Sequence, residues 1–355
     1  MYPTSQRCPD CENPTCHARW TRREWLQTAA GAAALGAAGP LAALVPERSA
    51  RGGADGARRE PEPLVKLLYE SLSEAQREKI CFPWDYQHPE WGLLRTRISN
   101  NWNITEPVIG SDFFTKDQQE LIRAIFEGIF QPEWHARIDQ QLRDDAGGYG
   151  RSQSIALFGT PGSGPFQFVM TGRHMTIRCD GNSAEHVAFG GPIFYGHAGS
   201  CPDNFHEGPQ HEGNVFWHQA LEANKLFGML DGKQRKLALV EKLPEESAVG
   251  FRSERPGVPV SELSGDQKAL LQEVLRLLLE PYRKVDRDEV AACLMSQGGL
   301  DACSLAFYRE GDLGEDQVWD CWRLEGPAFV WYFRGTPHVH VWVNVADDPS
   351  VPLNS

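Results

Sequence analysis

The chain has 355 residues and a formal net charge of −13, and 41% of its residues are hydrophobic. This is a globular composition, with enough length to bury a sizeable core. The acidic balance argues against a nucleic-acid or anionic-membrane partner, because both attract basic surfaces. The partner that we expect is a small-molecule substrate or ligand.

The N-terminal residues 1–50 predict export. Arg22 and Arg23 precede a stretch rich in alanine and glycine over residues 28–44, which is too short and too weakly hydrophobic for a transmembrane helix. Together they resemble a twin-arginine export signal; a flexible tail is the alternative. Export predicts a periplasmic or extracellular protein with no stable membrane insertion after processing.

The linker at residues 51–63 is polar and rich in proline, glycine and charged residues, so we expect ordered structure to begin near Leu64. A single domain is predicted over residues 64–346, followed by a tail at 347–355.

Four helix starts carry a capping-box pattern, in which an N-cap side chain and a glutamine three residues later satisfy backbone N–H groups reciprocally. They begin at Ser73, Thr115, Asp231 and Ser264. Hydrophobic periodicity predicts helices at about 115–130, 133–145, 214–230, 232–242, 264–280 and 286–297. Strands are predicted at 154–158, 166–171, 175–179, 188–194, 304–308, 318–324, 328–333 and 339–345. The strands follow the helices in blocks, which indicates the α+β class.

Three elements recur in the same order and predict an internal duplication. The aligned pairs are Thr115 with Ser264, Ser154 with Ser304, and His174 with His338. The predicted copies, residues 113–180 and 262–345, are helix–helix–strands units, the second with an extra strand around 317–325. Pairing about a pseudo-two-fold axis would bring His174 and His338 together. Chance similarity of amphipathic segments is the alternative.

The candidate metal site centres on His338 and His340. Residues at i and i+2 of a strand point to the same face, so the two imidazoles would lie side by side and could chelate an ion. His174 is a further candidate ligand because it aligns with His338. His197 is another, because it ends an apolar strand directly after Gly196. A solvated strand face and a loop histidine bonded to backbone are the alternatives.

An all-histidine site without thiolate suits one ion of copper, zinc or iron, and the Irving–Williams order favours copper or zinc by raw affinity. Glu325 precedes Gly326 and Pro327 and is a candidate general base or a carboxylate that orients an imidazole; a surface acid is the alternative. The motifs of serine hydrolases, zincins and dinucleotide-binding folds are absent from the sequence.

The leading functional hypothesis is a metal-dependent enzyme, redox or hydrolytic, that acts on a small molecule. The rival is a metal- or ligand-binding protein without turnover. A coordination position left open beside an acid or base would favour the enzyme, whereas a closed site of four ligands would favour binding or structure.

Several long motifs carry a family resemblance that covers about residues 64–346. They lie at residues 68–72, 171–178, 180–182, 190–197, 214–217 and 325–344. These stretches resemble the uncharacterised family called DUF3500. The resemblance implies relatives with the same motifs, but no activity, so the metal hypothesis rests on the residues themselves.

Overall fold

The computed structural model describes residues 60–197, 215–312, 318–336 and 338–352. The expected export signal at residues 1–50 lies outside these ranges. The first described helix, α2 (Pro61–Ser71), starts three residues before Leu64. Within the described ranges, no helix combines the length and the apolar character needed to cross a bilayer.

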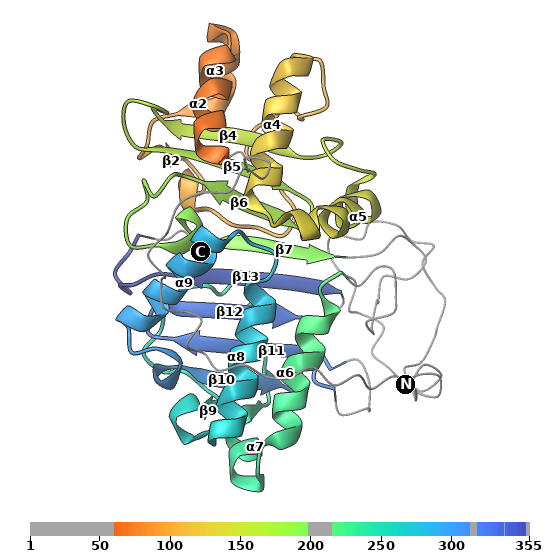
Figure 1. Ribbon diagram of the computed structural model, residues 1–355, viewed down its shortest axis with the longest axis vertical. Coiled ribbons are helices and arrows are strands. Elements are labelled where there is room, and N and C mark those ends of the chain that lie inside the picture. The colour runs from red at the N-terminus through yellow and green to blue at the C-terminus, as the bar shows by residue number, and fades with distance from the viewer. Residues whose placement is uncertain (1–59, 198–214, 313–317, 337, 353–355) are drawn as a thin grey trace, which may run out of the picture.

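One mixed sheet of eleven strands organises the described part of the chain (Figure 1). Its order is β1-β4-β5-β6-β7-β13-β12-β11-β10-β8, and β9 also pairs with β10. All pairings are antiparallel except β1 with β4 and β8 with β10. The strands are β1 (Cys81–Phe82), β4 (Ser154–Gly159), β5 (Phe166–Gly172), β6 (Met175–Cys179), β7 (Ile193–His197), β8 (Leu239–Val240), β9 (Val258–Pro259), β10 (Ser304–Tyr308), β11 (Cys321–Gly326), β12 (Phe329–Arg334) and β13 (Val339–Val345). A separate hairpin joins β2 (Gln87–His88) to β3 (Gly92–Leu93).

The helices begin where the capping boxes predict. At Ser73, Thr115, Asp231 and Ser264 the cap side chain accepts from the third helical N–H, and the glutamine returns to the cap N–H. Besides α2, the described helices are α3 (Glu74–Ile80), α4 (Lys116–Ile129), α5 (His135–Ala146), α6 (Trp217–Met229), α7 (Gly232–Ala238), α8 (Gly265–Leu279) and α9 (Lys284–Ser296).

Several predicted elements differ from the structure in their bounds; one is the strand predicted at 318–324, which lies at Cys321–Gly326. The helix predicted at 232–242 ends at Ala238, because the chain turns directly into β8. The strand predicted at 188–194 is shifted to β7, because residues 188–190 form a short 3₁₀ turn in which Phe189 has φ +59°.

The helices pack over one face of the sheet, with α4 over its first half and α6 and α8 over its second (Figure 1). Alternate strand residues such as Val341 and Trp331 join helix residues such as Ile122 and Leu271 in the main core. The opposite face is covered by connecting segments, and Val249 lies in one of them. The chain thus combines helices on one face with a large mixed sheet.

The centre of the sheet is the antiparallel pair β7–β13, in which His340 lies opposite Gly196 and Val339 opposite His197. Four strands, β4 to β7, follow α4 and α5, and four, β10 to β13, follow α8 and α9. A strand overlaps the stretch predicted around 317–325: it is β11, Cys321–Gly326. His174 lies between β5 and β6, and His338 lies between β12 and β13.

Candidate metal centre

Three histidines converge at the centre of the sheet. The Nε2 atoms of His174 and His338 are 3.0 Å apart, those of His174 and His340 are 3.0 Å apart, and those of His338 and His340 are 2.9 Å apart. All three side chains are buried. The predicted pairing of His338 with His340 on one strand face is confirmed, and the group could hold a metal ion.

The three rings point toward a common centre. Their centroids are 4.6–4.9 Å apart whereas their Nε2 atoms are 2.9–3.0 Å apart. Since Nε2 lies about 1.2 Å from its ring centroid, this convergence places the common point about 2 Å beyond the nitrogens, close to the usual metal–imidazole distance of about 2.0–2.1 Å.

His174 reaches this point from a tight turn. It follows Arg173 in the connection between β5 and β6 and has φ +54°, a left-handed conformation that is uncommon outside glycine. Its backbone N–H donates to the Asn100 carbonyl at 2.8 Å, which fixes the turn. Backbone strain of this kind concentrates at functional sites.

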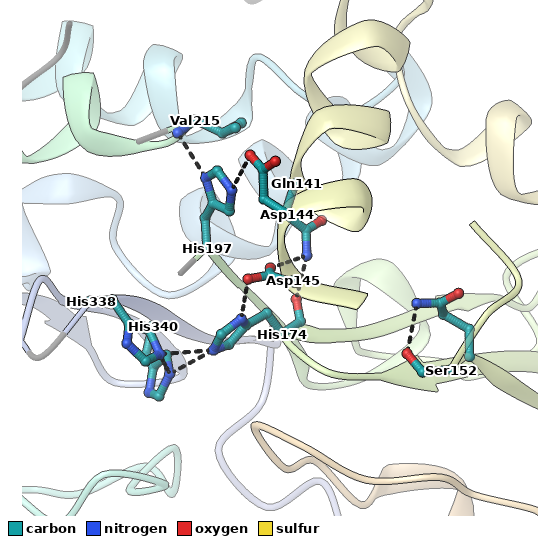
Figure 2. A network of polar contacts seen from close by, with 10 residues as sticks. Gln141, Asp144, Asp145, Ser152, His174, His197, Val215, His338 and His340 are labelled. Atoms are coloured by element: carbon teal, nitrogen blue, oxygen red, sulfur yellow. Dashed lines mark hydrogen bonds and ion pairs between the residues drawn. The ribbon is translucent and has the colours of Figure 1, made fainter. Parts of the chain in front are cut away.

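Asp145, near the C-terminal end of α5, orients the His174 ring (Figure 2). Its Oδ1 lies 3.0 Å from His174 Nδ1, and both side chains are fully buried. Gln141, one turn earlier, donates to Asp145 Oδ2 at 3.0 Å. A carboxylate only accepts, so the ring proton is favoured on Nδ1 and the Nε2 lone pair faces the common centre.

Glu246 orients the His340 ring in the same way. It lies in the segment between β8 and β9, and the His340 Nδ1–H donates to its Oε1 at 2.5 Å. Arg334 Nη1 is 3.2 Å from the other carboxylate oxygen. Burial alone would raise the pKa of Glu246, but the hydrogen bond from His340 and the charges of His340 and Arg334 outweigh it and lower that pKa.

His197 is not brought into the triad. It lies opposite Val339, whose side chain belongs to the helix-side core, so His197 also faces the helices, while His340 and Gly196 face the other side. Its Nδ1 accepts from the Val215 N–H at 3.2 Å, so its Nε2–H donates to Asp144 at 3.1 Å (Figure 2). Burial lowers the pKa of His197. Both ring nitrogens of His197 thus form hydrogen bonds to groups other than the triad. The expectation that His197 is a fourth ligand is corrected.

Glu325 also lies elsewhere. It forms a bidentate ion pair with Arg252, with both distances 2.7 Å, and contacts Arg323 at 3.1 Å. Through β12 it aligns with Asn344 of β13, four residues beyond His340, or about 13 Å along the strand. Glu325 therefore belongs to an arginine–glutamate–arginine cluster in which Glu325 and Arg323 are buried and Arg252 is partly exposed, and its expected place beside an imidazole is corrected.

The carboxylates that do contact the triad, Asp145 and Glu246, are not among the predicted site residues. Asp145 carries one local signal: with Asp144 it lies in the last turn of a helix, where the helix dipole disfavours negative charge. Two adjacent aspartates at such a position indicate another role. Glu246 carries no comparable signal, since it lies in a segment without regular structure.

The motifs around these histidines belong to one family. A family model described as "Protein of unknown function (DUF3500)" matches residues 62–346. Neither a curated protein nor a solved structure matches the chain. The match spans most of the sequence and contains all three histidines of the triad, and the chain therefore belongs to the DUF3500 family.

Proposed function

We propose that this protein is a metal-dependent enzyme acting on a small molecule, with His174, His338 and His340 as the ligands of one metal ion. The observation that carries the proposal is the convergence of three Nε2 atoms within 2.9–3.0 Å of one another. With Nδ1 protons held by Asp145 and Glu246, lone pairs of His174 and His340 face each other. A cation between them removes this repulsion.

The ligand count favours an enzyme over a closed structural site. Structural zinc sites have four protein ligands, whereas catalytic sites commonly have three and keep a position for water or substrate. The group found among the described residues contains three histidines. The rival function, metal or ligand binding without turnover, shares the ion and differs only in the chemistry at the open position.

The donor set suits copper, zinc or iron. Imidazole binds all three metals, and the site contains no thiolate that would select a softer ion. Carboxylates that accept from the Nδ1–H groups increase ligand basicity and fix the ring orientation. When bound, the ion would supply Lewis acidity or redox capacity at the open position, while Asp145 and Glu246 hold the imidazoles in place.

We further propose that the domain is a duplication of one unit, with the pair β7–β13 at its pseudo-two-fold axis. Two reciprocal amide pairs support it. Gln76 and Gln118 exchange hydrogen bonds at 2.9 and 3.1 Å, and Gln234 and Gln267 do so at 2.8 and 3.1 Å. One glutamine of each pair also donates to the carbonyl of the last residue of an earlier helix. Gln118 donates to Ser71 at the end of α2, and Gln267 donates to Met229 at the end of α6. The strand order supports an equivalence of β5 with β11.

Export remains a proposal, supported by Arg22, Arg23 and the apolar stretch after them. Its test is replacement of both arginines by lysine, which should leave an unprocessed precursor in the cytoplasm. Normal export of that variant would contradict it.

The metal proposal is tested by elemental analysis of the protein purified from its native compartment. The wild type should contain about one equivalent of copper, zinc or iron. The double variant His338→Ala, His340→Ala should lose it while keeping its circular-dichroism spectrum. His186→Ala, which removes an exposed histidine outside the triad, is the matched control and should keep the metal. Unchanged metal content in the double variant would refute the site.

A turnover test separates the two functional classes. Oxygen uptake and ester hydrolysis should be screened with the wild type, the chelator-treated protein and the double variant in parallel. Activity that depends on both the metal and the two histidines supports the enzyme. A metal-loaded protein that binds small molecules stoichiometrically without turning any over supports the rival.

A further inference from the structure

The spacing of the three nitrogens defines the angles at the ion. With bonds of about 2.0–2.1 Å, nitrogens 2.9–3.0 Å apart subtend about 90–95° at the metal. A tetrahedral ion with the same bonds would hold its nitrogens about 3.3–3.4 Å apart. Around an ion, His174, His338 and His340 would therefore fit one triangular face of an octahedron better than three corners of a tetrahedron.

A facial set of three ligands leaves three positions, all adjacent to one another. The open positions lie at about 90° from each other, as in the iron sites with two histidines and one carboxylate. A ligand with two oxygens in a five-membered chelate ring can occupy two of them. At a tetrahedral site with three histidines, only one position would be open.

The charged side chains next to the triad determine which net charge a bound ligand should have. Asp145 and Glu246 each contribute one negative charge, and Arg334, 3.2 Å from Glu246, contributes one positive charge. Around a divalent ion, these contacts leave a net charge of about plus one beside three buried imidazoles, where charge is screened less than in water. A singly charged anion balances it.

From these two observations we infer that the centre is a facial three-histidine site whose substrate class is a monoanionic oxygen chelator, such as a 2-hydroxy or 2-oxo carboxylate. The inference rests on the proposed metal site and adds its coordination geometry and ligand class. It also favours ions that accept five or six ligands, iron(II) and copper(II), over tetrahedral zinc.

The test uses the full-length protein loaded with one equivalent of Co²⁺. Six-coordinate cobalt(II) has weak visible absorption bands, whereas four-coordinate cobalt(II) has intense ones. Lactate and propionate are then titrated in as a matched pair, since they have the same carboxylate and differ in the hydroxyl group that closes a chelate ring. We expect weak bands, and lactate binding at least about tenfold more tightly than propionate, a difference of about 1.4 kcal/mol.

Each outcome has a distinct meaning. Intense tetrahedral bands, or equal affinity for lactate and propionate, would overturn the facial geometry or the ligand class while leaving the metal site intact. Failure to bind Co²⁺, or binding that is unchanged in His338→Ala, His340→Ala, would overturn the metal site and this inference with it. Retention of the lactate preference in His186→Ala is expected, because His186 is exposed and lies outside the triad.

Discussion

The absence of a side chain at Gly196 makes room for the imidazole of His174. Gly196 lies opposite His340 in the β7–β13 pair, and a Cβ built on it would lie 3.3 Å from His174 Cδ2 and 2.3 Å from the Val339 carbonyl oxygen. Real Cβ atoms do not approach a backbone oxygen so closely. The site thus depends on a glycine in the strand that carries none of its ligands.

Gly196→Ala should therefore abolish stoichiometric metal binding and destabilise the protein by about 1–3 kcal/mol, the usual range for overpacking. Gly228→Ala is the matched control, because nothing lies within 4 Å of a Cβ at that helical position. It should keep the metal and stabilise the protein by up to about 1 kcal/mol. Metal content and urea denaturation measure both effects. Wild-type metal content in Gly196→Ala would contradict the packing argument.

Asp145→Asn should weaken metal binding by about 10–100-fold, the usual effect of losing a carboxylate that orients a ligand histidine. The change preserves size but removes the charge that favours the Nδ1 proton of His174. Competition with a chelator of known affinity measures the loss. Asp144→Asn, at the neighbouring position that contacts His197 instead, should bind metal as the wild type does. Equal losses in the two variants would show that the helix end, and not the His174 contact, matters.

Glu246→Gln should likewise lower the metal affinity about 10–100-fold, because Glu246 orients the ligand His340. The amide can still accept from Nδ1–H, but the charge that faces Arg334 disappears. The fold should persist, since Glu246 lies in a connecting segment that is partly exposed. An unfolded variant, seen by circular dichroism, would instead assign Glu246 a structural role.

His197→Gln should keep one equivalent of metal. The glutamine amide can donate to Asp144 and its oxygen can accept from the Val215 N–H, which are the two hydrogen bonds of His197. Metal analysis beside His338→Ala gives the comparison. Loss of the ion in His197→Gln would restore His197 to the ligand set.

Stability should fall as pH rises, because of Glu289. Burial, together with the charge of Asp180, raises the pKa of Glu289 to about 7. Its folded-state pKa exceeds its unfolded one, so the folded protein binds the extra proton, and the free energy of unfolding decreases from about pH 5 to pH 8. Glu289→Gln should remove this part of the slope and stabilise the protein at pH 8 by about 1–2 kcal/mol, after allowance for partial exposure.

Denaturation at both pH values measures the difference. Asp288→Asn, at an exposed position of the same helix, is the control and should leave the slope unchanged. The side-chain amide oxygen introduced by Glu289→Gln can still accept from the Phe189 N–H, as the carboxylate does at 3.1 Å. A variant with the wild-type pH dependence would show that Glu289 is not the titrating group. Asp286, whose pKa burial raises to about 6, would then be the next candidate.

Local features of the sequence determined much of the fold. The four capping boxes located helix starts, because both partners lie within one turn. The strands predicted at 304–308 and 339–345 have the observed bounds of β10 and β13, and apolar residues alternate along β13. The pairing of His338 with His340 was predicted in the same way. Extended backbone by itself places side chains two residues apart on the same face.

Only the tertiary structure decided the rest of the site. The face on which His197 lies depends on its register with Val339, and a shift of one residue in that register would reverse it. Asp145 and Glu246 reach the triad from a helix end and a connecting segment, and Glu325 pairs with Arg252 from another segment. Such contacts join residues far apart in the chain, so no periodicity records them. They follow from how the helices and connecting segments pack around the sheet.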